Sequence, residues 1–164
     1  MTIYIKNKHT LQIDDFKFRC CIGKNGFTKK KREGDKKTPK GIFGIENLYF
    51  RKDRKKKPST LLKCIEIKKN MGWCDDIRFP KKYNKLFKID KKIKHEKLKR
   101  RDHKYDFLIP IKYNFKKTVV GCGSCIFIHL TKNFKPTAGC IALKEKDFLI
   151  MLKLIKKNSK IKIN

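Results

Sequence analysis

The apolar run at residues 125–130 is the feature that most constrains how this chain can fold. It has the unbroken apolar character of a strand buried on both faces, and His129 stands near its end. The chain then makes a short excursion through Pro136 and reaches Gly139 and Cys140, which a second apolar stretch follows. A hairpin-like return of this kind would bring Cys140 back beside His129.

A cysteine next to a histidine suits nucleophilic chemistry. A free thiol has a pKa of about 8.5 and is only slightly ionised at neutral pH, so a nearby base is needed to form the thiolate. A glycine before the nucleophile, here Gly139, leaves room for backbone N–H groups to face a developing oxyanion. Two plain alternatives stay open: Cys140 as a small buried hydrophobic residue, and His129 as a core histidine with its hydrogen bonds satisfied.

The flanking residues make the nucleophile interpretation stronger. The turn reads Thr137-Ala138-Gly139-Cys140 and follows Pro136, and further matching segments occur in order along the chain. These segments are residues 33–43, 72–76, 83–84, 96–106 and 121–129. Together, from about residue 15 to the C-terminus, they resemble the L,D-transpeptidase catalytic domain family of the YkuD type, in the branch with a Pro-Thr-x-Gly-Cys turn.

The resemblance implies a set of site residues. Cys140 matches the nucleophile and His129 the general base, while Gly139 and the Cys140 N–H are expected at the oxyanion hole. Residues expected to contact substrate are Gly123, Ser124, Thr137, Arg100 and Arg101. A β-bulge explains Gly123 equally well, and a solvated basic face is an alternative for both arginines.

The chain departs from the commonest family pattern at two positions. Ala138 stands where a second histidine is usual, and Ala142 replaces the Arg or Asn usually found two residues after the cysteine. The spacing from His129 to Cys140 is also shorter than in most of the family. The nucleophile and base are kept, but the group that holds the substrate carboxylate is left open, and Arg100 and Arg101 are candidates for it.

The charge of the chain admits two interpretations. The 164 residues, expected to form one domain (1–164), carry a formal net charge of +31, which by itself suggests a polyanionic partner. Lysine greatly outnumbers arginine, however, and the lysine runs are scattered. Base recognition and bidentate phosphate binding favour arginine, so solvated lysine faces are the simpler explanation.

The seven cysteines are an odd number, so at least one thiol has no partner within a monomer. Cys122 and Cys125 have the C-x-x-C spacing of zinc sites and dithiol centres, but Cys20-Cys21 lacks chelating spacing, and the pair precedes a strand rather than a helix. Packing near the cleft is therefore favoured over metal or redox roles. Asp75-Asp76 is interpreted as a polar turn rather than a metal or acid pair.

The apolar pattern predicts a mainly β domain, which agrees with the curved β-sandwich-like fold that the resemblance implies. Expected strands are residues 2–6, 10–14, 16–22, 41–50, 62–67, 106–113, 125–130 and 160–163. Residues 144–157 have apolar positions at helical spacing and predict one amphipathic C-terminal helix. Residues 70–105 show no clear period and are expected to be an irregular, substrate-covering insertion with one helical turn near residues 96–101.

The leading hypothesis is a cysteine acyltransferase acting on peptidoglycan stem peptides, as an L,D-transpeptidase or L,D-carboxypeptidase. It needs no metal or organic cofactor, no specific nucleic acid and no transmembrane segment, and a monomer is expected. The family substrate implies the cell envelope or periplasm, although no signal peptide is apparent at the start of the sequence and the abundant cysteine fits a reducing compartment. The alternative is a basic module that binds an anionic polymer, a cell-wall polymer or nucleic acid, with an inactive site.

Overall fold

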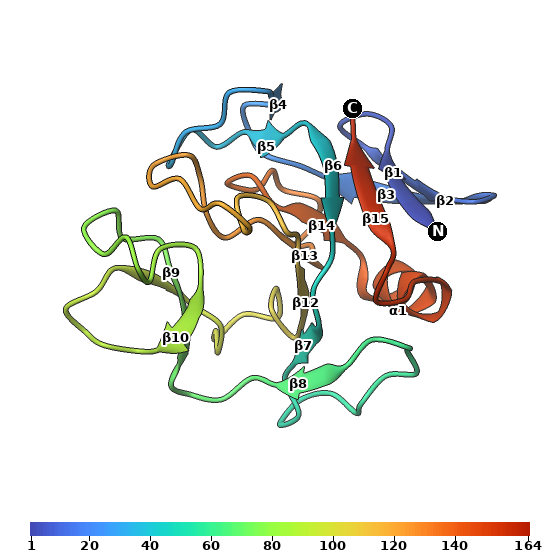
Figure 1. Cartoon of the computed structure of the whole chain (residues 1–164). Helices are drawn as coiled ribbons and strands as arrows, with labels where there is room; N and C mark the ends of the chain where they lie inside the picture. Colours follow the sequence, from blue (N-terminus) through green and yellow to red (C-terminus); the bar gives the residue numbers. More distant parts are fainter.

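The computed structural model describes residues 1–164 and is built mainly of strands, with one helix near the C-terminus (Figure 1). The strands are β1 (Thr2–Ile5), β2 (Thr10–Ile13), β3 (Phe16–Cys21), β4 (Phe27–Thr28), β5 (Thr38–Pro39), β6 (Gly41–Gly44), β7 (Leu48–Phe50), β8 (Cys64–Glu66), β9 (Met71–Cys74), β10 (Leu86–Lys88), β11 (His95–Lys97), β12 (Phe107–Pro110), β13 (Phe127–Leu130), β14 (Ile141–Leu143) and β15 (Lys160–Ile163). The helix is α1 (Glu145–Leu154). The predicted fold class is confirmed.

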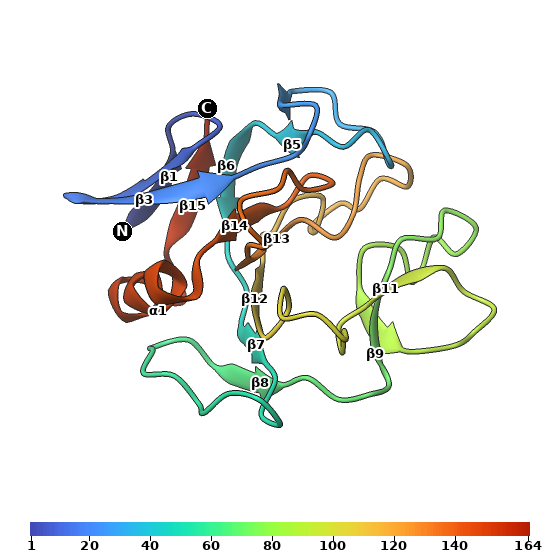
Figure 2. The same cartoon turned by 180° about the vertical axis from the view of Figure 1, so that it is seen from behind.

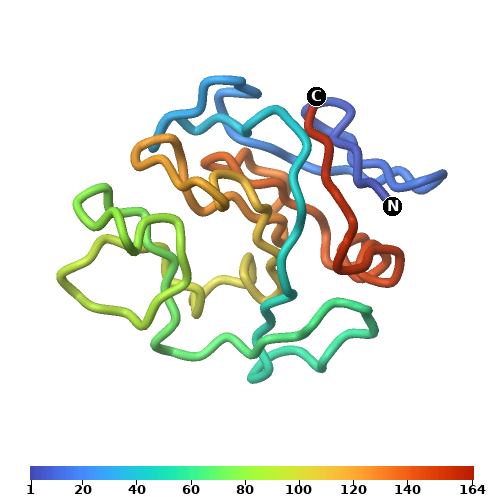
Figure 3. Tube along the Cα trace, in the orientation of Figure 1, coloured from blue at the N-terminus to red at the C-terminus, as the bar shows by residue number.

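Ten strands form one curled sheet, shaped like half of a barrel, in the order β6-β15-β1-β2-β3-β14-β13-β12-β7-β8. The first and last strands, β1 and β15, are neighbours that pair in parallel, and the tube in Figure 3 shows both termini on the same side of the molecule. Strands β13 and β14 lie in the middle of the sheet and also pair in parallel. Every residue of β13 is buried, as its unbroken apolar run predicts.

The main core lies between this sheet and α1. Its 25 buried residues include Phe148, Met151 and Leu152 of the helix, which pack over the sheet residues. The ring of Phe148 stacks on Phe107 of β12, with the centroids 5.9 Å apart. The helical spacing of these apolar residues therefore anchors α1 to the sheet, as the sequence predicts.

Residues 70–105 differ from the expectation. They contain a three-stranded antiparallel sheet in the order β10-β9-β11, and the helical turn expected near residues 96–101 is wrong, because β11 and a bend occupy that region. In Figures 1 and 2 this insertion forms a lobe on the side of the molecule opposite the termini. It packs on the main sheet through a second cluster in which Trp73 contacts Tyr49 and Phe127.

Other differences are small. The expected strand at residues 41–50 is interrupted after Gly44, so β6 and β7 pair with different neighbours at the two ends of the sheet. The loop at residues 23–41 contains the short strands β4 and β5, which pair in parallel. No helix has the length and apolar character needed to span a bilayer.

Candidate active site

A cavity of about 220 Å³ opens where the ends of β13 and β14 meet the end of the insertion. Its wall comes from the insertion, from β13, from the excursion that leads to β14, and from β14 itself. The lining residues are Glu96, Arg100, Lys104, Tyr105, His129, Thr131, Lys132, Lys135, Pro136, Thr137, Ala138, Cys140 and Ala142. The two residues singled out as nucleophile and base are both among them.

The strand register explains why Cys140 and His129 share this cavity. The parallel pairing of β13 with β14 places His129 opposite Ala142. Alternate residues of a strand point to the same face, so Cys140, which lies two residues before Ala142, is on the face of His129. The small Ala142 side chain leaves space beside the imidazole.

His129 is buried, and its surroundings fix its tautomer. Its Nδ1 lies 2.8 Å from the Leu130 carbonyl oxygen, which can only accept, so Nδ1 carries the hydrogen and Nε2 is left as a free acceptor. The Tyr105 ring packs edge-on against the imidazole at 5.2 Å. Burial, and then the positive charges of Lys104 and Arg100, lower the pKa of His129 to about 4 even though the Leu130 hydrogen bond opposes this. The imidazole is therefore neutral at physiological pH.

Cys140 is 8% exposed and its thiol is also neutral at rest. Its Sγ donates to the Cys125 carbonyl oxygen at 3.1 Å and accepts from the Phe127 N–H at 3.4 Å. Burial raises the pKa of Cys140 to about 12, and the Phe127 N–H only partly offsets the increase. No hydrogen bond joins Sγ to His129, so the thiol proton must leave the Cys125 carbonyl before Nε2 can accept it.

The turn before Cys140 is held from within and from behind. Thr137 Oγ1 donates to the Cys140 carbonyl at 2.6 Å and accepts from the Gly139 N–H at 3.1 Å. From behind, the buried Thr38 hydroxyl donates to the Gly139 carbonyl at 2.8 Å and accepts from the Gly23 N–H. The Gly139 N–H is thus occupied, whereas the Cys140 N–H has no hydrogen-bond partner and is available to an oxyanion.

The two arginines proposed for substrate lie differently. Arg100 lines the cavity, but its guanidinium makes two hydrogen bonds to Asp102 and one to Glu96 and lies over the Tyr105 ring. Arg101 is exposed and lies outside the cavity lining. The unpaired cations of the lining are instead Lys104, Lys132 and Lys135.

Gly123 and Ser124 lie outside the cavity lining, on the loop that leads into β13. The Ser124 hydroxyl donates to Glu33 at 2.7 Å, and Glu33 also accepts from the Tyr83 hydroxyl. The Gly123 N–H donates to the same Tyr83 oxygen. Asn84 adds a further contact, because its Oδ1 accepts from both the Trp73 indole and the Cys125 N–H. This network fixes the loop whose Cys125 carbonyl holds the thiol.

The remaining cysteines and acids form no metal site. All seven cysteines are free thiols, including Cys122 and Cys125, and no group of three or more His, Cys, Asp or Glu side chains is arranged to hold a metal ion. Asp76 forms a two-pronged ion pair with Arg78, and Asp75 pairs with Lys94.

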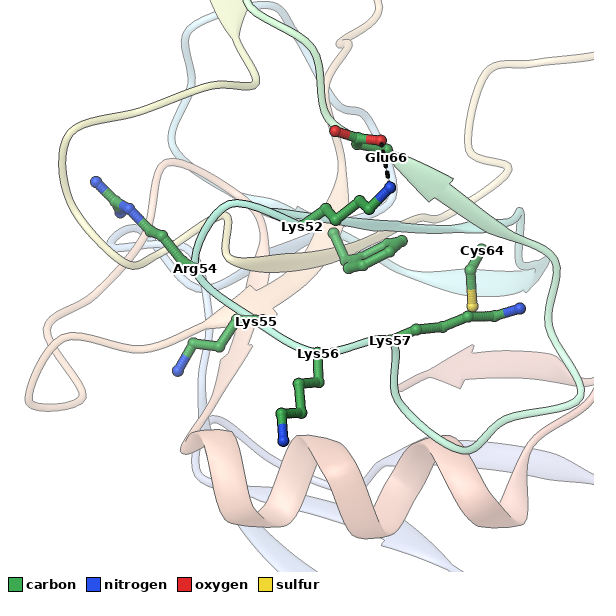
Figure 4. Close-up of a pocket in the computed structure, with 8 residues that line it drawn as sticks. Lys52, Arg54, Lys55, Lys56, Lys57, Cys64 and Glu66 are labelled. Carbon is green, nitrogen blue, oxygen red and sulfur yellow. Dashed lines mark ion pairs between the residues drawn. The ribbon is translucent and has the colours of Figure 1, made fainter.

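The largest cavity is elsewhere. It has a volume of about 680 Å³ and lies beside β7 and β8, under the loop that follows β7 (Figure 4). Its lining holds five cationic side chains and one acidic one, together with Phe50 and Cys64; the charged residues are Lys52, Arg54, Lys55, Lys56, Lys57 and Glu66. We refer to it as the lysine cavity. It contains neither Cys140 nor His129.

Three structural residues of the active-site region carry no role in the sequence prediction. Thr38 and Tyr105 belong to segments that support the family resemblance, but their contacts with Gly139 and His129 come from parts of the chain distant in sequence. Lys104 faces the same cavity. Their presence in the matching segments was the one signal in the sequence, and it did not indicate which turn or ring they support.

Fold and site together define a class: a curled β domain with a buried thiol and a neutral imidazole in one small cavity. Comparison with protein families identifies it further. The family model described as the L,D-transpeptidase catalytic domain, YkuD, matches residues 1–163, so the chain belongs to this family. The match also includes the first strands, before the start of the resemblance at about residue 15. No significant match was found among curated proteins or among solved structures. Family members are L,D-transpeptidases, which supports an enzyme of this kind with a peptidoglycan-related role.

Proposed function

We propose that this protein transfers acyl groups of peptidoglycan stem peptides through a thioester on Cys140. The observation that carries this is the shared cavity, in which a buried thiol, an imidazole with an unprotonated Nε2 and an unpaired backbone N–H meet. These are the nucleophile, the base and the oxyanion donor that acyl transfer requires.

The reaction begins from the neutral pair. Rotation of the Cys140 side chain away from the Cys125 carbonyl directs the thiol proton to His129 Nε2, and Sγ then adds to the carbonyl carbon of an L,D peptide bond. Because the resting thiol and imidazole are both neutral, the ion pair forms only as the bond to carbon forms. The Nδ1–H bond to Leu130 holds the ring in orientation while Nε2 becomes protonated.

The tetrahedral oxyanion accepts a hydrogen bond from the Cys140 N–H. One such donor is worth about 3 kcal/mol of transition-state stabilisation in acyl-transfer enzymes. As the intermediate collapses, the bond to the D-amino acid nitrogen breaks and His129 Nε2–H protonates the departing amine, leaving the thioester. An amine of a second stem peptide then attacks to give a crosslink, or water attacks to give a shortened peptide.

The cavity favours an anionic donor peptide. Arg100 is engaged by Glu96 and Asp102, so Lys104, Lys132 and Lys135 are the cations free to meet a substrate carboxylate. These lysines would bind the substrate carboxylate, a function that the apolar Ala142 side chain cannot provide. A volume of about 220 Å³ admits the end of a peptide rather than a folded partner. A monomer acting where peptidoglycan is built, in the cell envelope, fits this proposal.

The test is turnover of a stem tetrapeptide that ends in D-alanine, followed by mass spectrometry with the wild type and His129→Gln. A transient mass increase equal to the tetrapeptide less D-alanine, with release of D-alanine, is expected for the wild type only. Products with and without an added acceptor amine separate transpeptidase from carboxypeptidase. Equal D-alanine release by the His129→Gln variant would reject the proposed base.

A second function is favoured by the lysine cavity: attachment to an anionic polymer. Lys56 and Lys57 are exposed and have no ion-pair partner, and Figure 4 shows Lys57 beside Cys64 and Lys56 directed toward α1. Lysines act as point charges for phosphate oxygens, so a phosphate-bearing polymer is the fitting partner. Retention on a polyphosphate column that falls steeply with salt would support it. Unchanged retention of a Lys56→Gln, Lys57→Gln double variant would place the binding elsewhere.

A further inference from the structure

Lys31 is a buried lysine behind the catalytic turn. It lies in the loop between β4 and β5, and only 4% of its side chain is exposed. Its Nζ forms an ion pair with Asp35 Oδ1 at 2.5 Å and a longer contact to the Arg32 carbonyl at 3.4 Å. Lysines are rarely buried to this extent, so the position of this ammonium calls for a reason.

One glycine makes room for the Lys31 side chain, and a second lies beside its ammonium group. Gly123 and Gly139 both have positive φ, +96° and +137°. A Cβ on Gly123 would lie 2.8 Å from Lys31 Cγ and 2.9 Å from its Cε, and a Cβ on Gly139 would lie 3.6 Å from Nζ. The side chain therefore runs along Gly123 and ends beside Gly139, the residue that precedes the nucleophile.

Backbone hydrogen bonds hold the Asp35 carboxylate, which is the counter-ion of Lys31. Asp35 accepts hydrogen bonds from the Arg32 and Lys37 N–H groups in addition to Lys31. Burial opposes ionisation of Asp35, but these hydrogen bonds hold its pKa below the usual value. The pair is thus charged, with its anion locked by backbone donors and its cation beside the turn.

The charge of Lys31 acts on Cys140. Among the ionisable groups that influence the thiol, Lys31 and Arg100 lower its pKa and Glu96 raises it, while burial raises it most. Arg100 is neutralised by Glu96 and Asp102 on the cavity side. Lys31 is therefore the cation that supports negative charge on Cys140 from the side opposite the substrate.

We propose that Lys31 is a positioning residue of the active site, which fills the space behind Gly123 and Gly139 and keeps a fixed positive charge beside the Cys140 turn. The proposal rests on the proposed role of Cys140 as nucleophile. It gives Gly123 a function, because a side chain at this position would displace the lysine. It also assigns a function to the Lys31–Asp35 segment, which no step of the reaction uses.

The experiment measures the rate of Cys140 alkylation by iodoacetamide between about pH 7 and pH 9, where lysines are charged and the rate follows the small thiolate fraction of Cys140. The tryptic peptide of residues 133–144 contains Cys140 as its sole cysteine, so its mass reports this thiol alone. Lys31→Met keeps the length of the side chain and removes its charge. We expect the alkylation rate at pH 8 to fall roughly three- to tenfold. Lys30→Met, at an exposed neighbouring lysine, is the matched control and should leave the profile unchanged.

Asp35→Asn should change the Cys140 alkylation rate in the opposite direction. It therefore separates an electrostatic role of Lys31 from a structural one. It keeps Lys31 but removes its counter-ion, so we expect the Cys140 alkylation rate at pH 8 to rise. A purely structural role would shift both variants in the same direction, and that outcome, or no shift in either, would overturn the proposal. If Lys31→Met fails to fold by circular dichroism, an unchanged or slower alkylation rate at pH 8 in Asp35→Asn overturns the proposal alone. Alkylation reads the thiol whether or not acyl transfer occurs, so a failure of the proposed function is detected separately.

Discussion

The active-site cavity and the lysine cavity differ in both size and chemistry, and the smaller one holds the reactive groups. The lysine cavity is about three times larger, at about 680 Å³ against about 220 Å³, and carries more formal charge. Yet the groups with large pKa shifts that could act as nucleophile and base, Cys140 and His129, both line the small one. Burial is what makes the difference, because desolvation changes the pKa of a thiol or imidazole while exposed ammonium groups stay hydrated.

The loop after β7 contacts both the lysine cavity and the wall of the active-site cavity. Arg51 and Arg54 follow β7, and Arg54 lines the lysine cavity. Both reach the active-site wall: Arg51 donates to the Arg100 carbonyl at 2.6 Å, and Arg54 donates to the carbonyls of Arg101 and Asp102. The same loop thus exposes lysines to solvent and anchors the backbone that carries Arg100. Substitutions of the lysines must therefore leave the hydrogen bonds of Arg51 and Arg54 intact.

The largest expected effect is on acylation by a carbapenem, whose strained ring carbonyl acylates nucleophiles. We expect one stoichiometric adduct on the wild type and complete loss of it in Cys140→Ala, measured by intact mass. Cys64→Ala, at the half-buried thiol of the lysine cavity, is the matched control and should keep the adduct. An adduct that persists in Cys140→Ala would show that the reactive nucleophile is a residue other than Cys140.

The next effect is on stability at acid pH and depends on His129. The pKa of the folded state is about 4 and that of the unfolded state is the ordinary value near 6.5, so between them the unfolded chain binds the extra proton. Stability contributed by the neutral buried ring is present above pH 6.5 and is lost as pH falls toward 4, by about 3 kcal/mol. Urea unfolding from pH 7 to pH 4 should show this loss in the wild type and a smaller one in His129→Gln. Parallel curves for the two proteins would contradict the buried neutral histidine.

Several elements could be predicted from the sequence because their signals are local. The alternation at residues 2–6 and 10–14, the apolar run that becomes β13 and the helical spacing of α1 all fix which side chains are buried. Strands β9, β10 and β11 have only three or four residues, too few for a period to stand out in a lysine-rich background. Their pairing is decided by tertiary contacts such as those of Trp73.

The candidate site also has some residues that the local sequence predicts and others that it does not. Cys140 and His129 belong to one contiguous segment, and a sequence pattern can place them together. Lys31 and Thr38 reach the turn before Cys140 from one distant loop, and Tyr105 packs on the His129 ring from another; nothing in their local sequence specifies these contacts. Lys31 in particular reads as one of many lysines until its burial is known.

A third effect concerns the turn itself. Gly139→Ala would put a side chain on a residue with φ +137°, with its Cβ 2.8 Å from the Lys37 carbonyl oxygen. Gly34→Ala is the control, because Gly34 also has positive φ but its Cβ would meet nothing within 4 Å. We expect Gly34→Ala to cost about 1 kcal/mol of unfolding free energy from backbone strain and Gly139→Ala about 2 kcal/mol more. Equal costs in thermal or urea unfolding would show that the catalytic turn relaxes freely.

The smallest expected effect on stability is at the lysine cavity, and it completes the comparison. Lys56→Gln with Lys57→Gln removes two exposed charges that have no ion-pair partner, so the unfolding free energy should change by less than about 0.5 kcal/mol. Retention on polyphosphate should weaken, and the slope of log affinity against log salt should fall by about one for each phosphate that a lysine no longer neutralises. A double Lys91→Gln, Lys92→Gln variant, on the insertion, matches the change in net charge. If both variants weaken retention equally, the binding reflects the net charge of the protein rather than the lysine cavity.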